Sequence, residues 1–236
     1  MPFSHSSRGR LTAYDLGRFP GDTLFDRLGR TLCHAESLPR KELYEAWEVA
    51  RRARRLFRGG RVVDLGAGHG LLAHVMLLLD DSSPSALAVD PSLAPSSQTV
   101  HDALVAAWPR LAGRVTFTTA PLDEVTLEAD DVLVSSHACG ALTDQILARA
   151  VGASARVAAL PCCHDDETCD GGPLAGWMEF GLAVDTVRAL RLEQQGYRVW
   201  TQAIPADITP KNRLLLGAPL EGFPVAAAPR AVPRRR

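Results

Sequence analysis

Two short runs of histidine and cysteine carry the residue types in this 236-residue chain that are best suited to chemistry. One reads Ser-His-Ala-Cys-Gly at 136–140 and the other reads Pro-Cys-Cys-His at 161–164. Histidine titrates near neutral pH, so His137 is a candidate general base or acceptor-orienting group. Its alternative role is structural, as a cap of the following helix or a partner for a carbonyl group. Cys139 is the second candidate catalytic residue. Its alternative, shared with Cys162, is a small buried thiol that packs beneath a ligand.

The same side chains pose the question of a metal, because zinc binds cysteine and histidine. The residues to consider are His137, Cys139, Cys162, Cys163, His164 and Cys169. Among them, only Cys163 paired with His164 or Cys169 has a spacing that resembles a metal-binding motif. The sequence therefore predicts no metal site. The five cysteines are an odd number, which also argues against a disulfide framework.

A glycine-rich turn at 61–70 is the second stretch suited to chemistry. Asp64 ends an apolar run, three glycines follow at alternate positions, and an apolar, helix-compatible segment comes next. The order strand, turn, helix opens nucleotide-binding α/β sheets. The dinucleotide fingerprint needs a glycine where this chain has Leu71, so NAD(P) binding is disfavoured. Asp90 closes the next predicted strand about 20 residues further on, where an acid can hold both hydroxyls of an adenosine ribose.

The elements that position these residues follow a regular order of five strand–helix repeats and then two strands. After the first strand, which ends at Asp64, strands are expected at 85–90, 114–119, 131–135, 156–160, 197–203 and 214–217. Helices are expected at 22–30, 37–57, 71–79, 99–111, 141–150, 174–182 and 184–194. The last two strands are joined by a loop without room for a crossover helix, so they must pair antiparallel. We therefore predict an α/β, Rossmann-like fold whose seven-stranded sheet has five parallel strands and an antiparallel final pair, with helices on both faces.

The glycine turn, this topology and the two strand-end runs resemble the class I methyltransferases that use S-adenosylmethionine. The His-Ala-Cys-Gly-Ala-Leu-Thr-Asp run at 137–144 and the Leu-Pro-Cys-Cys-His run at 160–164 are similar to those of one methyltransferase-like family, which includes tRNA 2′-O-methyltransferases. The resemblance covers 64–217, but the zinc-finger modules of the tRNA enzymes are absent. It implies methyl transfer from S-adenosylmethionine, and it favours RNA as the acceptor, with a 2′-hydroxyl of tRNA as the implied position.

The resemblance also implies which residues hold S-adenosylmethionine. An acid near the turn meets the ammonium group, the turn approaches the ligand, a second acid binds the ribose and a third turn borders the adenine. The cofactor-binding residues predicted in this way are Asp64, Gly66, Ala67, Gly68, Gly70, Asp90, Pro91, Pro121, Leu122 and Ser136.

An arginine-rich helix face is the candidate contact surface for RNA. Arg51, Arg54, Arg55 and Arg58 fall largely opposite the apolar side of the helix predicted at 37–57, where they could bind phosphates. The alternative is a solvated face near a helix C-terminus, which cations suit. The net charge of −1 gives no general attraction for nucleic acid. A small-molecule or protein acceptor is expected instead if the N-terminal helices cover the pocket, and a non-catalytic S-adenosylmethionine-binding protein is the third alternative.

The chain divides into three predicted parts. These are an N-terminal arm and helical extension at 1–58, a methyltransferase domain at 59–218 and a disordered tail at 219–236. The apolar content of 46% is that of a globular protein, and no apolar run approaches the roughly 20 residues that a membrane helix requires. The first ten residues are polar and contain no apolar signal core. We therefore expect a cytoplasmic protein without a membrane partner.

Overall fold

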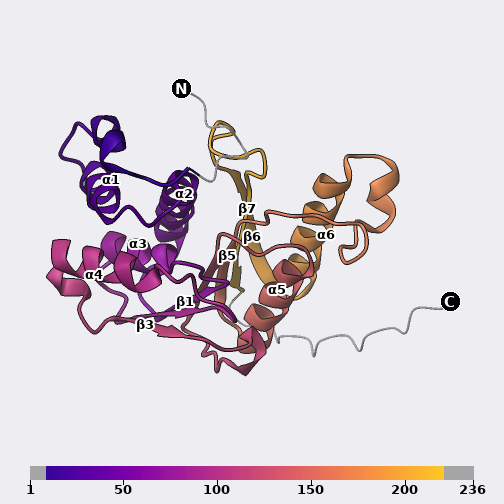
Figure 1. The fold of residues 1–236 in the computed structure, drawn as a ribbon. Helices are drawn as coiled ribbons and strands as arrows, with labels where there is room; N and C mark the ends of the chain where they lie inside the picture. Colours follow the sequence, from indigo (N-terminus) through magenta and orange to yellow (C-terminus); the bar gives the residue numbers. More distant parts are fainter. Residues whose placement is uncertain (1–8, 221–236) are drawn as a thin grey trace.

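A seven-stranded sheet with helices on both faces forms the centre of the protein (Figure 1). The computed structural model describes residues 9–220. The helices are α1 (Leu24–Ala35), α2 (Arg40–Leu56), α3 (Leu71–Leu79), α4 (Ser97–Ala107), α5 (Ala141–Ala153) and α6 (Phe180–Gln194). The strands are β1 (Val62–Leu65), β2 (Ala86–Val89), β3 (Val115–Thr118), β4 (Val132–Ser135), β5 (Arg156–Ala159), β6 (Tyr197–Ala203) and β7 (Arg213–Pro219). Short 3-10 turns are η1 (Ala13–Arg18), η2 (Pro109–Leu111), η3 (Leu122–Glu124) and η4 (Gly172–Gly176).

The strands lie in the order β3-β2-β1-β4-β5-β7-β6. The first five strands of the chain pair in parallel, and β7 runs antiparallel between β5 and β6. The predicted sheet is thereby confirmed, including its antiparallel final pair. The chain moves outward from β1 to β3 and then returns to place β4 on the other side of β1. Open α/β sheets bind ligands at such a reversal, at the carboxyl ends of the strands.

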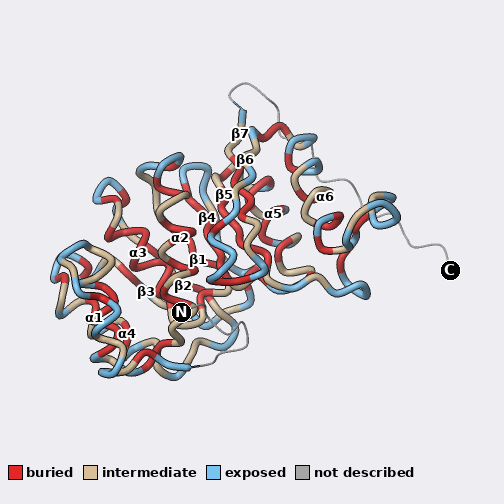
Figure 2. The backbone as a smooth tube through the Cα atoms, turned by 90° about the horizontal axis from the view of Figure 1, so that it is seen from above, coloured by how far each residue is buried: buried red, intermediate tan, exposed pale blue. Residues whose placement is uncertain are grey.

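Alternation along the strands divides the apolar side chains into two cores. On β1, Val62 packs with α1 to α4, whereas Val63 packs with α5 and α6. On β4, Val132 and Leu133 divide in the same way. Figure 1 shows the two groups of helices on opposite sides of the sheet, and Figure 2 shows buried residues in the central strands and along the helices that cover them. Because both faces are covered, the strand ends remain as the place for a ligand.

The N-terminal helices belong to the same core as the sheet. α2 packs along α3, and α1 packs against α4. The ring of Phe25 lies between those of Tyr44 and Trp47, with centroids 5.2 and 5.0 Å apart. The two helices are therefore fixed on the face of the sheet that α3 and α4 cover.

The division of the chain at 174–194 into two helices is wrong. The structure has the 3-10 turn η4 and then one continuous helix, α6. The carboxylate of Glu179 accepts hydrogen bonds from the N–H groups of Gly181 and Leu182 at 2.8 and 2.9 Å, so the helix begins at this cap. β3 and β4 are joined through η3 alone, so one of the five predicted repeats lacks its helix.

The end of the described chain lies close to the predicted boundary at residue 218. β7 continues through Pro219, and the predicted tail beyond Leu220 lies outside the described residues. Within residues 9–220, no helix combines the length and the apolar character that crossing a membrane requires.

Candidate functional site

The glycine-rich turn joins the end of β1 to the start of α3 and lies against the end of β2. The N–H groups of Gly66 and Ala67 donate hydrogen bonds to the carbonyl oxygen of Val89 at 2.9 and 3.0 Å. The N–H of Gly68 donates to Oδ2 of Asp90 at 3.0 Å. Asp90 therefore lies beside the turn, although 22 residues separate it from Gly68 along the chain.

Two of the glycines are required for different reasons. Gly68 and Gly70 both have a positive φ, of 54° and 71°, which favours glycine. A Cβ atom on Gly68 would meet nothing within 4 Å, so the backbone there is open to a ligand. A Cβ atom on Gly70 would lie 2.5 Å from Cε1 of Phe117, so this glycine allows the turn to pack against β3. The open side of the turn is therefore at Gly68.

Asp64 is buried beneath the turn, with an exposed fraction of 1%. Its Oδ2 accepts a hydrogen bond of 3.2 Å from the N–H of Ala73 in α3, whereas its Oδ1 has no partner within residues 9–220. Burial, together with the negative charges of Glu42 and Asp90, raises the pKa of Asp64 to about 8. A buried carboxyl oxygen without a donor is suited to a cationic group of a ligand.

Acidic residues of α2 border the site, and the sequence did not predict this. Glu42 and Glu45 are both buried. Oε2 of Glu42 lies 2.8 Å from Nδ1 of His69 in the glycine turn. Glu45 pairs with Lys41 and interacts electrostatically with His137 after β4. The sequence could have indicated this, because Glu42 and Glu45 are three residues apart and therefore share one face of the helix. The first turns of α2 therefore lie over the strand ends.

His137 lies in the loop after β4, next to the buried Ser136. The helix α5 begins after Gly140 without a side-chain cap, so His137 does not cap it. Nε2 of His137 is buried and has no hydrogen-bond partner in the described part of the chain. A ring nitrogen in this position can accept a proton from a bound group, which is what a general base requires.

The residues predicted to border the adenosine lie in the loops after β2 and β3. Pro91 directly follows Asp90 and is exposed. Pro121 is also exposed, whereas Leu122 is buried and packs in the core shared with α5. Of the two predicted adenine walls, Pro121 is therefore the more accessible.

Cys139 is not a buried thiol. It is exposed and lies with Cys162 and Cys163, where the loops after β4 and β5 meet. The interpretation of Cys139 as a small buried thiol is therefore wrong. Hydrogen bonds from Cys162 and Cys163 to its thiolate lower the pKa of Cys139. His164 is separate from this group, because its Nε2 contacts Oδ1 of Asp185 at 2.7 Å.

The predicted arginine surface is wrong for Arg54. This side chain is 2% exposed and forms an ion pair of 3.2 Å with Asp80. It also donates to the carbonyl oxygen of Met76 and to the hydroxyl of Ser83, at 3.0 and 2.8 Å. Arg54 follows the buried Ala50 by four residues, so it shares the inner face of α2.

The other arginines of this surface lie away from the strand ends that carry the turn. Arg51 pairs with Glu48 at 3.1 Å, and Arg55 is exposed. Arg58 lies 3.6 Å from Asp80, beyond the C-terminal end of α3. Because α2 runs from the glycine turn to this end of α3, Arg55 and Arg58 lie toward the amino ends of the strands.

A cavity of about 430 Å³ lies between α6 and the β6–β7 pair. Pro161, at the end of β5, forms one side of it. Ala189, Leu214 and Leu215 give it an apolar lining, and Arg213 is among its polar residues. Its volume is within the range of small-molecule sites.

Comparison with known families gives one match. A family described as Methyltransferase domain matches residues 42–168, which is more than half of the chain. The matched segment begins in α2 and includes the glycine turn, Asp90 and both strand-end runs. No curated protein matches the chain.

Several solved structures resemble the fold at low sequence identity. An O-methyltransferase family protein from Burkholderia thailandensis is 19% identical, with a TM-score of 0.47 over 89% of this chain and 64% of that one. This chain thus spans less than two thirds of that relative. A ribosomal protein L11 methylase from Lactobacillus delbrueckii is 15% identical, with a TM-score of 0.49 over 77% and 79% of the two chains. TrmK from M. capricolum, solved with S-adenosylhomocysteine, is 12% identical, with a TM-score of 0.45 over 72% and 66%.

Proposed function

The chain belongs to the Methyltransferase domain family, and on that premise we propose that it transfers the methyl group of S-adenosylmethionine to an acceptor at the carboxyl ends of β4 and β5. The observation that carries the proposal is the buried, unpartnered Oδ1 of Asp64 in β1, together with the open backbone of Gly68 in the turn that follows this strand. That pair fits a ligand with a cationic end and no pyrophosphate.

The residues at the first three strand ends fit S-adenosylmethionine. Asp64 would meet the ammonium group, and the turn formed by Gly66, Ala67, Gly68 and Gly70 would border the ligand. Asp90 and Pro91 would hold the ribose, Pro121 and Leu122 the adenine, and Ser136 the side near β4. Bound there, the cofactor supplies a methyl group on a sulfonium centre, which a nucleophilic atom can attack.

His137 is the proposed general base. Its buried Nε2 has no partner within residues 9–220, so it can take the proton of an acceptor hydroxyl as the methyl group is transferred. Glu45, which pairs with Lys41, lies near enough to His137 to interact with it electrostatically. The protein's other contribution is to hold donor and acceptor in line.

A small-molecule acceptor fits the geometry best. The first turns of α2 lie over the strand ends, and two of their buried residues, Glu42 and Glu45, are acidic. Two acidic residues over the strand ends disfavour a polyanion such as RNA there. The apolar cavity beside Pro161 provides a volume suited to a small organic molecule.

An RNA 2′-hydroxyl is the second candidate acceptor. It is favoured by the likeness of the 137–144 and 160–164 runs to those of tRNA 2′-O-methyltransferases. Arg54 is excluded from such a contact by its burial. Arg51, Arg55 and Arg58 could bind only parts of an RNA that are remote from the reacting nucleotide, because of where they lie along α2.

Incubation with methyl-labelled S-adenosylmethionine distinguishes these acceptors. The wild-type chain is incubated with a metabolite extract and, separately, with total RNA, and the Asp90→Ala variant serves as the control with a weakened donor site. We expect label in the metabolite fraction, with less label for the variant. Label in RNA instead would establish the second candidate. Binding of the donor without label in either fraction would leave a non-catalytic binding protein.

The affinity for S-adenosylmethionine is expected to rise with pH because of Asp64. Its raised pKa, about 8, keeps the carboxyl protonated at neutral pH, whereas an ammonium ligand favours the carboxylate. Binding must therefore release one proton, and the affinity should rise by about tenfold per pH unit between about pH 6 and pH 7. Above this range, the ligand's own amino group begins to titrate.

Calorimetry in buffers of different ionisation enthalpy measures this proton release directly. Asp64→Asn should bind more weakly and release no proton, whereas Asp90→Ala should bind more weakly with the release intact. Proton release that persists in Asp64→Asn would assign the linkage to another group.

A further inference from the structure

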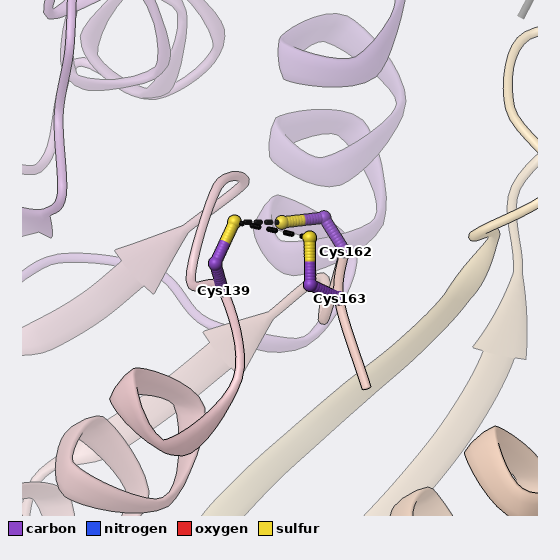
Figure 3. A group of neighbouring side chains, drawn as sticks. All are labelled: Cys139, Cys162 and Cys163. Atoms are coloured by element: carbon purple, nitrogen blue, oxygen red, sulfur yellow. Dashed lines mark hydrogen bonds between the residues drawn. The ribbon is translucent and has the colours of Figure 1, made fainter. Parts of the chain in front are cut away.

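Three thiols from two loops meet at the carboxyl ends of β4 and β5 (Figure 3). Sγ of Cys139 lies 2.8 Å from Sγ of Cys162 and 3.3 Å from Sγ of Cys163. All three sulfur atoms lie within 4.8 Å of one another. We call Cys139, Cys162 and Cys163 the thiol cluster. Figure 3 shows the three side chains converging on one point from the two loops.

The register of the parallel strands brings these thiols together. Ser135 at the end of β4 pairs with Ala159 at the end of β5, 24 residues later in the chain. Cys139 and Cys163 are also 24 residues apart and form an isolated parallel bridge. The N–H of Gly140 donates to the carbonyl oxygen of Cys163 at 3.1 Å and closes this bridge. The pairing of β4 and β5 therefore continues past their ends and fixes the cluster before any ligand binds.

The loop that carries Cys139 is also held from the other side. The guanidinium of Arg188, which is 1% exposed, donates to the carbonyl oxygen of Gly140 at 2.8 Å. The same group bonds to Asp144 at the start of α5. The backbone next to Cys139 is therefore anchored to α6, and the sulfur atoms are held without contributing to the core.

Three converging thiolates are ligands for a soft or borderline metal ion. Zinc binds cysteine at about 2.3 Å, so tetrahedral ligands place sulfur atoms about 3.8 Å apart. The separations in the thiol cluster, from 2.8 Å to less than 4.8 Å, bracket that value. We propose that Cys139, Cys162 and Cys163 together bind one Zn²⁺ ion through their sulfur atoms.

The ligand set leaves one coordination position of the zinc without a cysteine. Structural zinc sites have four protein ligands, whereas sites with three keep the fourth position for water or a substrate atom. Cys139 and Cys163 are exposed, so solvent reaches the cluster. This proposal does not rest on the proposed methyl transfer, because zinc binding is measured without donor or acceptor.

Metal analysis of the full chain tests the site. The protein is reduced with a phosphine, incubated with Zn²⁺, desalted and assayed for zinc and protein. We expect one zinc ion per wild-type chain and a loss of affinity of at least about a hundredfold in Cys162→Ser/Cys163→Ser. Cys169→Ser is the matched control, because Cys169 is a nearby buried cysteine outside the cluster and should keep its zinc. Circular dichroism of each variant verifies folding.

Cobalt provides a second readout that does not depend on the variants. Co²⁺ titrated into the wild-type chain should give a thiolate-to-metal charge-transfer band that Zn²⁺ removes and that Cys139→Ser weakens. A reduced wild-type chain that binds neither ion would overturn the proposal. So would equal zinc in the wild type and in a folded Cys162→Ser/Cys163→Ser variant. A Cys139–Cys162 disulfide that persists under reducing conditions would replace the metal site by a redox pair.

Discussion

Replacement of Arg188 by methionine is expected to lower the free energy of unfolding by about 3 kcal/mol or more. Arg188 is buried, forms a two-pronged contact of 3.1 and 2.7 Å with Asp144, and lies 3.3 Å from Asp185. It also satisfies the carbonyl oxygen of Gly140. Removal of the cation leaves Asp144 and the carbonyl oxygen of Gly140 without this donor, whereas Asp185 keeps its contacts with His164 and Arg213. The effect should fall at the lower end of the range for buried pairs, because the carboxylate of Asp144 reaches solvent.

Urea denaturation measures this loss, and the slope against urea concentration should stay unchanged. Arg191→Met is the matched control on the same helix, since Arg191 pairs with Asp170 at the surface and both side chains are about half exposed. This substitution should lower the free energy of unfolding by less than about 1 kcal/mol. Equal losses for the two variants would show that the Arg188 network adds no more than a surface ion pair.

The His137→Ala variant is expected to lose between about a hundredfold and ten-thousandfold in turnover while it still binds S-adenosylmethionine. Nε2 of His137 is buried and unpartnered in the described chain, so its removal breaks no hydrogen bond of that nitrogen. The loss should therefore be in kcat, with little change in donor affinity or in stability. Turnover of the labelled acceptor and calorimetric binding of the donor measure the two quantities separately.

Two further variants make this test specific. His137→Gln retains a polar side chain of similar size but cannot take a proton at neutral pH, so it should be as slow as alanine. His34→Ala, at an exposed position in α1, should keep full turnover. If His137→Gln were as active as the wild type, His137 would orient the acceptor by hydrogen bonding and another group would accept the proton.

The sheet could be predicted because each strand is indicated by the residues of its own short segment. Four of the five parallel strands are short apolar runs followed by a turn, and a parallel strand buried on both faces needs no more than that. The edge strand β3 was predicted from its alternation of apolar and polar residues. The antiparallel ending followed from the length of the loop before β7. The start of α6 could not be predicted in the same way. It depends on how the carboxylate of Glu179 folds back onto two N–H groups, and the apolar residues from Leu174 onward gave a competing helical pattern.

The site residues at the ends of strands could be predicted from the sequence. Those whose position depends on how helices pack against the sheet could not. Asp64 and Asp90 close strands, so their place at the sheet edge follows from the sequence. Burial of Arg54 depends on Asp80 and on the carbonyl oxygen of Met76 in α3, which no pattern within α2 reveals. The contacts of Glu42 and Glu45 with the site required the position of α2 across the strand ends.

Because β4 and β5 share one register, the thiols meet only if the two loops that follow these strands keep equal lengths. The number of residues between the cysteines in the sequence can vary. Three residues separate Ser135 from Cys139, and three separate Ala159 from Cys163. A residue inserted into either loop would move one thiol past its partner, whereas an insertion between α5 and β5 would alter the spacing in the sequence and leave the sulfur atoms in place. Relatives with the same cluster should therefore be sought by equal lengths of the two loops, even where the number of residues between their cysteines differs.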